Sequence, residues 1–569
     1  MIDVDVSDSR LSVSAPSRLA NVISRIPGLS LSRGGTGWVG PATPAAMFAV
    51  VADLSHLSGF SPSDAATARI VEVSGERAAV SSLKVDAGVV YDGRLFDYQH
   101  AGVAMMLRGG CLLGDEMGTG KTVMALTAAR QCRGATLVVA PNSMKHRWAR
   151  EAEVWYPEAR TFVVEGTAKQ KQQVLADAVL SQRMGEPIVV SVNWESLRTL
   201  SRVASYGSIK RSGKEQEAGP LNDITWQVVI ADEAHRAKDP KSKQTRALWA
   251  VAQGAPYRWA LTGTPVLNTP GDLWSIGRFY DPDSYGSGRQ KWHNRFVAYI
   301  DTNWGPKDIG LNGAREAEFT AGFDMSFIRR TKDEVLSLPP VTYQVRAVEM
   351  AAKQKSAYNK MVKDMIVRID DGILAATDPL ALLTRLSQIA SATPVVDADG
   401  NVVALDAPSN KVAALLEILD DMDEARPVVV FAQSRKLIEL ADRELQRKGI
   451  STALVTGAVS AELRDANVQR FQEGGGRVAL CTLGAGSEGI NLFAADTAVF
   501  LQRSYSFGQS QQAEARVHRV GQVADKVTII DLVSCESVDE AVIEALQFKG
   551  DMSEEVLRDR ARQLLRSKV

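Results

Sequence analysis

The sequence predicts an α/β protein in which two parallel-sheet lobes follow a small α+β module. Two series of short β-branched runs, each separated by helical patterns, predict the sheets, because strands that alternate with helices form βα units. The length supports this division. A chain of 569 residues is too long for one hydrophobic core, and roughly 150 residues per domain suggests three or four structural units.

The first lobe is expected over residues 94–335 and the second over residues 336–569. The clearest strands of the first lobe are residues 136–140, 187–192, 226–231 and 257–261. Those of the second are residues 427–431, 451–455, 477–481, 497–501 and 526–532. Helical periodicity over residues 351–389 predicts a helical protrusion from the second lobe, and the last 30 residues also look helical.

Residues 1–93 differ in character and form the predicted N-terminal module. Residues 26–38 contain two short strand patterns around a Gly-rich turn, and an apolar helix is expected from Ala45 to Leu54. We therefore expect a separate α+β module before the first lobe.

The composition limits the possible partners. Sixty-six basic against 67 acidic residues give a net charge of −1, so a DNA site would have to be a local cleft. The cysteines lie far apart, without a Cys-x-x-Cys pair, which argues against a zinc finger. Apolar runs stay below about 18 residues and the N-terminus is acidic, so we expect no membrane association and an intracellular location.

A glycine-rich phosphate loop occupies residues 114–122, between a short apolar run and a helix-forming segment. Gly118 and Gly120 allow backbone amides to approach phosphate oxygens, Lys121 adds a positive charge, and Thr122 offers a hydroxyl to magnesium. The regular pattern has a glycine five residues before Gly120, where this chain has Asp115. The predicted nucleotide-binding loop comprises Asp115, Glu116, Met117, Gly118, Thr119, Gly120, Lys121 and Thr122.

A pair of carboxylates, Asp232 and Glu233, follows the buried strand predicted at residues 226–231. Hydrolysis of ATP needs one acid to hold magnesium and another to polarise the attacking water. Asp232 and Glu233 can therefore supply one of these two roles each.

Seven motifs occur in the order found in superfamily-two helicase motors, at residues 95–99, 114–122, 232–236, 261–268, 327–335, 482–492 and 512–522. The last three make the chain resemble the Swi/Snf-type ATPases more narrowly, over about residues 95–550. The sequence departs from that pattern at Thr119, where leucine is usual, and at Ser487-Glu488, where Gly-Leu or Gly-Met is usual. Neither departure changes a phosphate ligand.

The resemblance implies two tandem RecA-like lobes that use ATP and Mg²⁺. It assigns Asp232, with Thr122, to the metal and Glu233 to the attacking water. It assigns Gln99 to the adenine edge, with Tyr98 packed nearby, and places Gln512 at the nucleotide. Tyr98 could equally be a core aromatic. It gives His235 and the segment Thr262, Gly263 and Thr264 a role in coupling nucleotide state to the cleft, although His235 could instead cap a helix.

The resemblance also assigns Arg516 and Arg519 as arginine fingers. Their three-residue spacing on a predicted helix places both guanidinium groups on one face, and such fingers raise turnover by about 10³ to 10⁵. An alternative for Arg519 is an ion pair between the lobes only.

DNA contacts in the family come from amides and small polar side chains at strand ends. Here they correspond to Pro141, Asn142, Ser143, Asn193, Trp194, Gln433, Ser434, Thr456, Gly457 and Thr482. Contacts of this kind bind phosphates, so they give affinity without sequence specificity.

The Pro-Gly pair and Gly-Trp pair of residues 26–38 resemble the HepA-related DNA-recognition repeat of annealing helicases and fork remodellers. We therefore expect a monomeric double-stranded-DNA translocase that remodels or reanneals branched DNA, in the cytoplasm of a bacterial or phage-infected cell or in a eukaryotic nucleus. Alternatives are a motor that strips proteins from DNA or drives a restriction or defence complex, and a nucleotide-switched DNA-binding scaffold.

Overall fold

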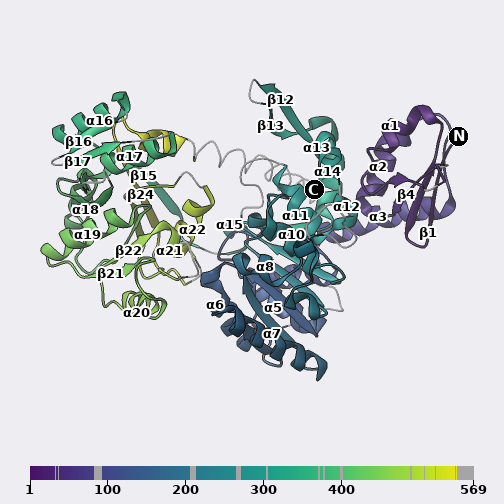
Figure 1. Ribbon diagram of the computed structural model, residues 1–569, viewed down its shortest axis with the longest axis horizontal. Helices are drawn as coiled ribbons and strands as arrows, with labels where there is room; N and C mark the ends of the chain where they lie inside the picture. Colours follow the sequence, from purple (N-terminus) through teal and green to yellow (C-terminus); the bar gives the residue numbers. More distant parts are fainter. Residues whose placement is uncertain are drawn as a thin grey trace. The chain divides into compact units, whose positions relative to one another are not determined.

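The computed structural model divides the chain into two compact units, with Met1–Val335 in the first and Leu336–Met552 in the second (Figure 1). The residues described are 1–32, 34–35, 37–82, 92–204, 213–263, 271–286, 288–302, 305–336, 338–364, 366–369, 372–375, 379–397, 401–486, 490–504, 507–519, 521–544 and 546. Among the helices of these residues, none combines the length and apolar character needed to cross a membrane.

The N-terminal module is a five-stranded sheet covered by helices. Its strands are β1 (Ile2–Ser7), β2 (Arg10–Ser14), β3 (Ser30–Leu31), β4 (Trp38–Pro41) and β5 (Phe60–Pro62), in the order β3-β4-β2-β1-β5. Along β1 the apolar Ile2 and Val4 are buried and the intervening aspartates are exposed, the period-two pattern of a sheet with one wet face. The expected pairing of two short strands is confirmed by β3 and β4, and the expected apolar helix is α2 (Pro44–Leu54).

The first lobe is built on a seven-stranded sheet whose strand pairs are all parallel. Its strands, in spatial order, are β14 (Phe327–Ile328), β6 (Cys111–Leu113), β11 (Tyr257–Leu261), β10 (Val228–Asp232), β7 (Ala135–Ala140), β9 (Ile188–Asn193) and β8 (Arg160–Val163). Successive residues of β10 enter two different buried clusters, Val229 on one face and Ile230 on the other. A sheet buried on both faces reads as a continuous apolar run, which is why the sequence predicted these strands.

Helices and one hairpin surround this sheet. The α-helices of this lobe are α4 (Asp97–Leu107), α5 (Lys121–Cys132), α6 (Lys145–Trp155), α7 (Ala168–Arg183), α8 (Trp194–Leu200), α9 (Gly213–Gln216), α10 (Lys243–Val251), α11 (Asp272–Tyr280), α12 (Pro282–Tyr285), α13 (Arg289–Phe296), α14 (Glu316–Asp324) and α15 (Lys332–Val335). Helix α3 (Asp64–Ser82) packs instead on β1 and β5 of the N-terminal module. The hairpin, β12 (Val297–Thr302) with β13 (Gly305–Leu311), was not predicted from the sequence.

The second lobe has a six-stranded sheet, again with only parallel pairs. In spatial order its strands are β15 (Val341–Val348), β24 (Val527–Ser534), β23 (Thr497–Phe500), β20 (Val428–Ala432), β22 (Val478–Thr482) and β21 (Thr452–Val455). The helices between them include α18 (Asn410–Asp420), α19 (Arg435–Arg447), α20 (Ala461–Gln472), α21 (Leu483–Gly486) and α22 (Phe507–Val517). Two parallel α/β lobes and an N-terminal module confirm the predicted fold class.

The segment of residues 351–389 contains the expected helices, α16 (Ala352–Asp364) and α17 (Pro379–Ser391). Between them lies an antiparallel hairpin of β16 (Ile366–Ile369) and β17 (Gly372–Ala375), which was not predicted. The β-branched residues at 366 and 367 favour a strand over a helix at this point. The helix predicted for the last 30 residues falls largely outside the described residues.

A buried group of charges attaches the N-terminal module to the first lobe. Arg295 of α13 contacts Asp53 of α2 at 2.7 Å and Glu318 of α14 at 2.7 Å. All three side chains are at most 5% exposed, and Arg315 completes the group from its edge. Since an unpaired buried charge is costly, these contacts fix the module to the lobe.

We predict that Asp53→Ala lowers the free energy of unfolding of the first unit by about 3 kcal/mol, because it leaves Arg295 with one carboxylate in place of two. Urea unfolding followed by tryptophan fluorescence measures the change. The matched control, Arg130→Ala, removes the exposed pair with Glu158 and should change stability by less than about 1 kcal/mol. Equal effects of the two substitutions would contradict the interpretation.

Candidate nucleotide and DNA sites

The strand order of the first lobe gathers the predicted nucleotide residues at one edge of the sheet. The phosphate loop follows β6, Thr262 follows β11, and the carboxylate pair ends β10. Strand β11 lies between the other two, and the chain crosses this position between β6 and β7. Ligands of open parallel sheets bind at such a switch point, outside the carboxyl ends of the strands.

The phosphate loop has the backbone that its glycines predict. Gly118 and Gly120 each adopt φ +88°, and α5 begins directly afterwards at Lys121. A β-carbon on Gly120 would lie 2.3 Å from Nε2 of Gln99, so a side chain cannot be accommodated there. The loop therefore presents backbone amides at a helix N-terminus, the arrangement that binds phosphate.

Lys121 lies among carbonyl oxygens and carboxylates. Its Nζ donates to the carbonyl oxygens of Asp115 at 2.6 Å and Glu116 at 3.1 Å. Burial lowers the pKa of Lys121, and the charges of Glu233, Asp115, Asp232 and Glu116 oppose that shift. The sequence-predicted lysine and carboxylates are thus close enough to interact.

Two tryptophans orient Asp232. The indole of Trp148 donates to Oδ2 of Asp232 at 2.8 Å, and that of Trp194 donates to its backbone carbonyl at 3.0 Å. Burial, followed by the charge of Glu233, raises the pKa of Asp232 to about 6, whereas Trp148 and Lys121 lower it. Sequence reasoning missed Trp148, since its only signal is a tryptophan on the polar helix α6.

Glu233 adopts a left-handed backbone conformation with φ +51°, a strained geometry that is concentrated at functional sites. Its Oε2 lies 3.3 Å from Nδ1 of His235, which also lies 3.1 Å from the hydroxyl of Thr262. Gly263 approaches Met117 of the phosphate loop closely. The structure thus brings together the predicted coupling residues His235, Thr262 and Gly263; Thr264 lies outside the described residues.

Gln99 and Tyr98 clamp the phosphate loop. The amide of Gln99 donates to the carbonyl of Thr119 at 3.0 Å and accepts from the backbone N–H of Phe96 at 3.0 Å. The hydroxyl of Tyr98 donates to the same carbonyl at 2.8 Å. The predicted contact of Gln99 with adenine stays a prediction, and the contacts seen here are with protein backbone.

The DNA contacts predicted for the first lobe lie at the ends of two neighbouring strands. Pro141, Asn142 and Ser143 follow β7, and Asn193 ends the adjacent β9. The side chain of Trp194 is fully buried and its indole donates to the carbonyl oxygen of Asp232, so its ring supports the carboxylate pair. A DNA contact of Trp194 would therefore use its backbone, and that contact stays a prediction.

In the second lobe the predicted DNA contacts also share one edge of the sheet. Gln433 and Ser434 follow β20, Thr456 and Gly457 follow β21, and Thr482 ends β22, which lies between those strands. Gln433 and Gly457 are exposed, whereas Thr456 is buried. The fold therefore brings these residues to one edge of the sheet, and their contact with DNA stays a prediction.

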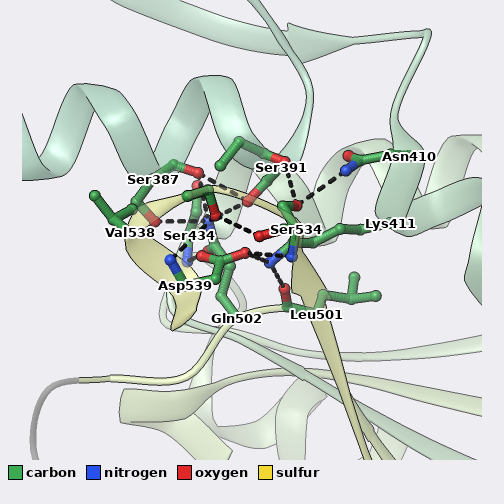
Figure 2. Close-up of polar contacts among 12 residues, drawn as sticks. Ser387, Ser391, Asn410, Lys411, Ser434, Leu501, Gln502, Ser534, Val538 and Asp539 are labelled. Atoms are coloured by element: carbon green, nitrogen blue, oxygen red, sulfur yellow. Dashed lines mark hydrogen bonds and ion pairs between the residues drawn. The ribbon is translucent and has the colours of Figure 1, made fainter. Parts of the chain in front are cut away.

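A polar network holds Ser434 in place (Figure 2). The backbone N–H of Ser434 donates to Oε1 of Gln502 at 3.0 Å, and Nε2 of Gln502 donates to the hydroxyl of Ser391 at 2.8 Å. Helix α17, which carries Ser391, is thereby connected to the strand end expected at DNA.

The same network contains a buried ion pair. Nζ of Lys411 lies 2.5 Å from Asp539 and donates to the carbonyl of Leu501 at 2.6 Å (Figure 2). A cavity of about 300 Å³ lies beside these residues and Ser434. Because Lys411 is paired with Asp539, its positive charge is neutralised within the fold.

The helix predicted for Arg516 and Arg519 is shorter than expected. Helix α22 ends at Val517, so Arg516 lies in its last turn with Gln512 one turn before, and Arg519 lies beyond its end. Arg519 donates to Oδ1 of Asn491 and lies near the carbonyl of Ile490. These contacts orient Arg519 independently of the helix.

The donor set suits a magnesium nucleotide. The Thr122 hydroxyl and the Asp232 carboxylate are hard oxygen ligands of the kind that Mg²⁺ prefers. The loop amides and Lys121 match the negative charge of phosphates. Thr122 and Asp232 are therefore the residues that would hold the metal, and this assignment stays a prediction.

Comparisons with known proteins identify the family of this chain. Residues 98–394 match the model of the SNF2-related domain, and residues 410–521 match that of the helicase conserved C-terminal domain. Chromodomain-helicase-DNA-binding protein 8 of Xenopus tropicalis is 26% identical, over 84% of this chain and 22% of that protein. A putative ATP-dependent helicase/translocase, YwqA of Bacillus subtilis, is 25% identical, over 82% of this chain and 49% of that protein.

Among solved structures, the Sulfolobus solfataricus SWI2/SNF2 ATPase core in complex with double-stranded DNA is 22% identical, covers 83% of this chain and 95% of that chain, and has a TM-score of 0.37. The chain spans less than half the length of the two curated relatives. The family models cover most of both lobes, and the chain therefore belongs to the SNF2-related family of ATPases.

Proposed function

We propose that this chain is an ATP-dependent double-stranded-DNA translocase that remodels or reanneals branched DNA. One observation carries the enzymatic part. Lys121 and the pair Asp232 and Glu233 lie after two strands of one parallel sheet, β6 and β10, that only β11 separates, and they interact electrostatically. A phosphate loop next to a carboxylate pair is the equipment for hydrolysing a nucleoside triphosphate.

In this proposal each residue of the first lobe has a distinct task. The loop amides and Lys121 bind the phosphates, and Glu233 orients the attacking water. Bound Mg²⁺ would supply charge stabilisation between the phosphate oxygens. Trp148 and Trp194 hold Asp232 in place, so that its carboxylate is available for the metal without rearrangement.

The second lobe would complete catalysis. Arg516 and Arg519 provide positive charge that stabilises the transition state of phosphoryl transfer when the lobes close on ATP. Hydrolysis then depends on closure, so cycles of closing and opening would move the protein along the DNA. This dependence distinguishes the motor from a nucleotide-switched scaffold with little turnover.

The proposed DNA-binding residues would bind without specificity for DNA sequence. Polar residues and backbone amides at the ends of β7, β9, β20, β21 and β22 are suited to phosphate oxygens. Binding of phosphates alone predicts a steep fall in affinity with salt. Binding without sequence specificity suits translocation. It suits equally a motor that strips proteins from DNA.

Support for branched DNA comes from the N-terminal module. It resembles a DNA-recognition repeat, and the buried Asp53–Arg295–Glu318 group holds it to the ATPase lobe. A recognition element fixed to the motor would present a junction to it in a constant orientation. This favours remodelling over simple protein displacement.

We predict that Lys121→Ala and Glu233→Gln have separable defects. Lys121→Ala should weaken ATP binding at least about tenfold, because Lys121 contacts the phosphates. Glu233→Gln should bind ATP nearly normally but turn over at least about 100-fold more slowly, because it acts on water. Binding of a fluorescent ATP analogue and steady-state hydrolysis with duplex DNA measure the two effects. Wild-type hydrolysis by Glu233→Gln would refute the assignment of the water-orienting carboxylate.

We predict that Arg516→Ala and Arg519→Ala each abolish DNA-stimulated hydrolysis while the first lobe still binds ATP, with losses of about 10³-fold or more. The same two assays apply. Exposed Arg447, paired with Glu444 of α19, provides a control substitution in the same lobe. If Arg516→Ala alone loses activity, Arg519 has a structural role through Asn491, and if neither does, the finger assignment fails.

The role of the N-terminal module is tested with Trp38→Ala, since Trp38 lies half-buried on β4. An indole that stacks on an unpaired base contributes about 1 to 3 kcal/mol, so the ratio of fork-stimulated to duplex-stimulated hydrolysis should fall. Circular dichroism tests whether the module stays folded. An unchanged ratio in a folded variant would contradict this role for Trp38.

A further inference from the structure

Asp115 occupies the place where the regular phosphate-loop pattern has a glycine, and its carboxylate is completely buried. Arg330 holds both of its oxygens, with Nε 3.0 Å from Oδ1 and Nη2 paired with Oδ2. Planar, two-point pairing of this kind is the strongest arrangement between arginine and a carboxylate. The contact joins residues that are far apart in the sequence and belong to different motifs.

Arg330 also reaches the far end of the same loop. Its Nη1 donates to the carbonyl oxygen of Tyr98, and its guanidinium lies 5.2 Å from the centre of the Tyr98 ring. The hydroxyl of Tyr98 donates to the carbonyl of Thr119. Arg330 is therefore connected to the loop directly at Asp115 and through Tyr98 at Thr119.

The backbone around Arg330 follows the loop as well. Gly114 donates to the carbonyl of Ile328 at 2.8 Å, and Glu116 donates to that of Arg330 at 2.9 Å. The carboxylate of Glu116 accepts from the backbone N–H of Lys332 at 2.8 Å. These bonds extend the pairing of β14 with β6 alongside the start of the loop.

Asp115 connects Arg330 to Lys121, the lysine proposed to bind the phosphates. Its side chain is held by Arg330, while its carbonyl oxygen accepts from Nζ of Lys121 at 2.6 Å. The packing leaves room for the guanidinium, because a β-carbon on Gly102 of α4 would lie 3.1 Å from Nη2 of Arg330. A buried ion pair contributes little net stability compared with apolar packing, which favours a role in fixing geometry.

We propose that Arg330 is a positioning residue for ATP, which sets the conformation of the phosphate loop by holding Asp115 and Tyr98. Arg330 acts through the loop and contacts no reacting atom. The proposal rests on the proposed use of ATP, and it explains why this loop carries an aspartate in place of the usual glycine.

The deciding variant is Arg330→Lys. It keeps a positive charge beside Asp115, but a single ammonium cannot hold both carboxylate oxygens and the Tyr98 carbonyl. We expect the ATP KM and the Kd of a fluorescent non-hydrolysable ATP analogue to rise about tenfold, equivalent to ~1.4 kcal/mol. The saturating kcat with duplex DNA should stay within about threefold of wild type, because the groups that act on water are untouched.

Two further variants define the pathway. Asp115→Asn should raise KM similarly, and the double variant with Arg330→Lys should add little, because both changes break one connection. Arg426→Lys is the matched control, since Arg426 makes the same two-point contact with Asp496 in the second lobe. It should leave KM unchanged.

Wild-type KM and Kd in Arg330→Lys would overturn the proposal, as would a loss confined to kcat or fully additive losses in the double variant. Arg330→Met should be more severe than Arg330→Lys. If it fails to fold, Arg330→Lys still decides. A wild-type chain that binds the analogue without hydrolysing ATP would contradict the proposed function, while the Kd values would continue to test Arg330.

Discussion

The order of strands in the first sheet is the constraint on which the nucleotide site depends. Because β11 lies between β6 and β10, the phosphate loop, Thr262 and the carboxylate pair are brought to one edge although about 110 residues separate the loop from the carboxylates along the chain. The contacts of His235 with Glu233 and Thr262 follow from this order. Exchange of the nucleotide bound at the loop would therefore affect the ends of β6, β11 and β10 together.

The concentration of charge at this edge has to be supported by the surrounding fold. The negative charges of Asp115, Asp232 and Glu233 all act on one lysine, Lys121, and buried charges are tolerated only when they are paired or hydrogen-bonded. Arg330 pairs with Asp115, and the indole of Trp148 donates a hydrogen bond to Asp232. A second buried charge group, around Arg295, connects the N-terminal module to the same lobe. Both groups use arginine, whose planar guanidinium serves several acceptors at once.

The sequence predicted what is local or periodic. Strands buried on both faces appear as apolar runs, and the glycines of the phosphate loop require their backbone conformation, so both could be read from residue order. It did not predict which side chains distant in the sequence form ion pairs or hydrogen bonds with each other. The pairing of Arg330 with Asp115, and the burial of Trp194 beneath Asp232, depend on tertiary packing. The hairpin of β16 and β17 was missed because the helical pattern of the flanking segments was extended across the β-branched residues at 366 and 367.

In the proposed function, ATP hydrolysis drives movement along duplex DNA. The decisive measurement is displacement of a labelled third strand from a triplex, followed over time with ATP, with a non-hydrolysable analogue and with Glu233→Gln. We expect displacement only with wild-type protein and ATP, after a delay that lengthens with the duplex tract preceding the triplex. Displacement without hydrolysis, or ATP hydrolysis stimulated by duplex DNA without any displacement, would contradict it.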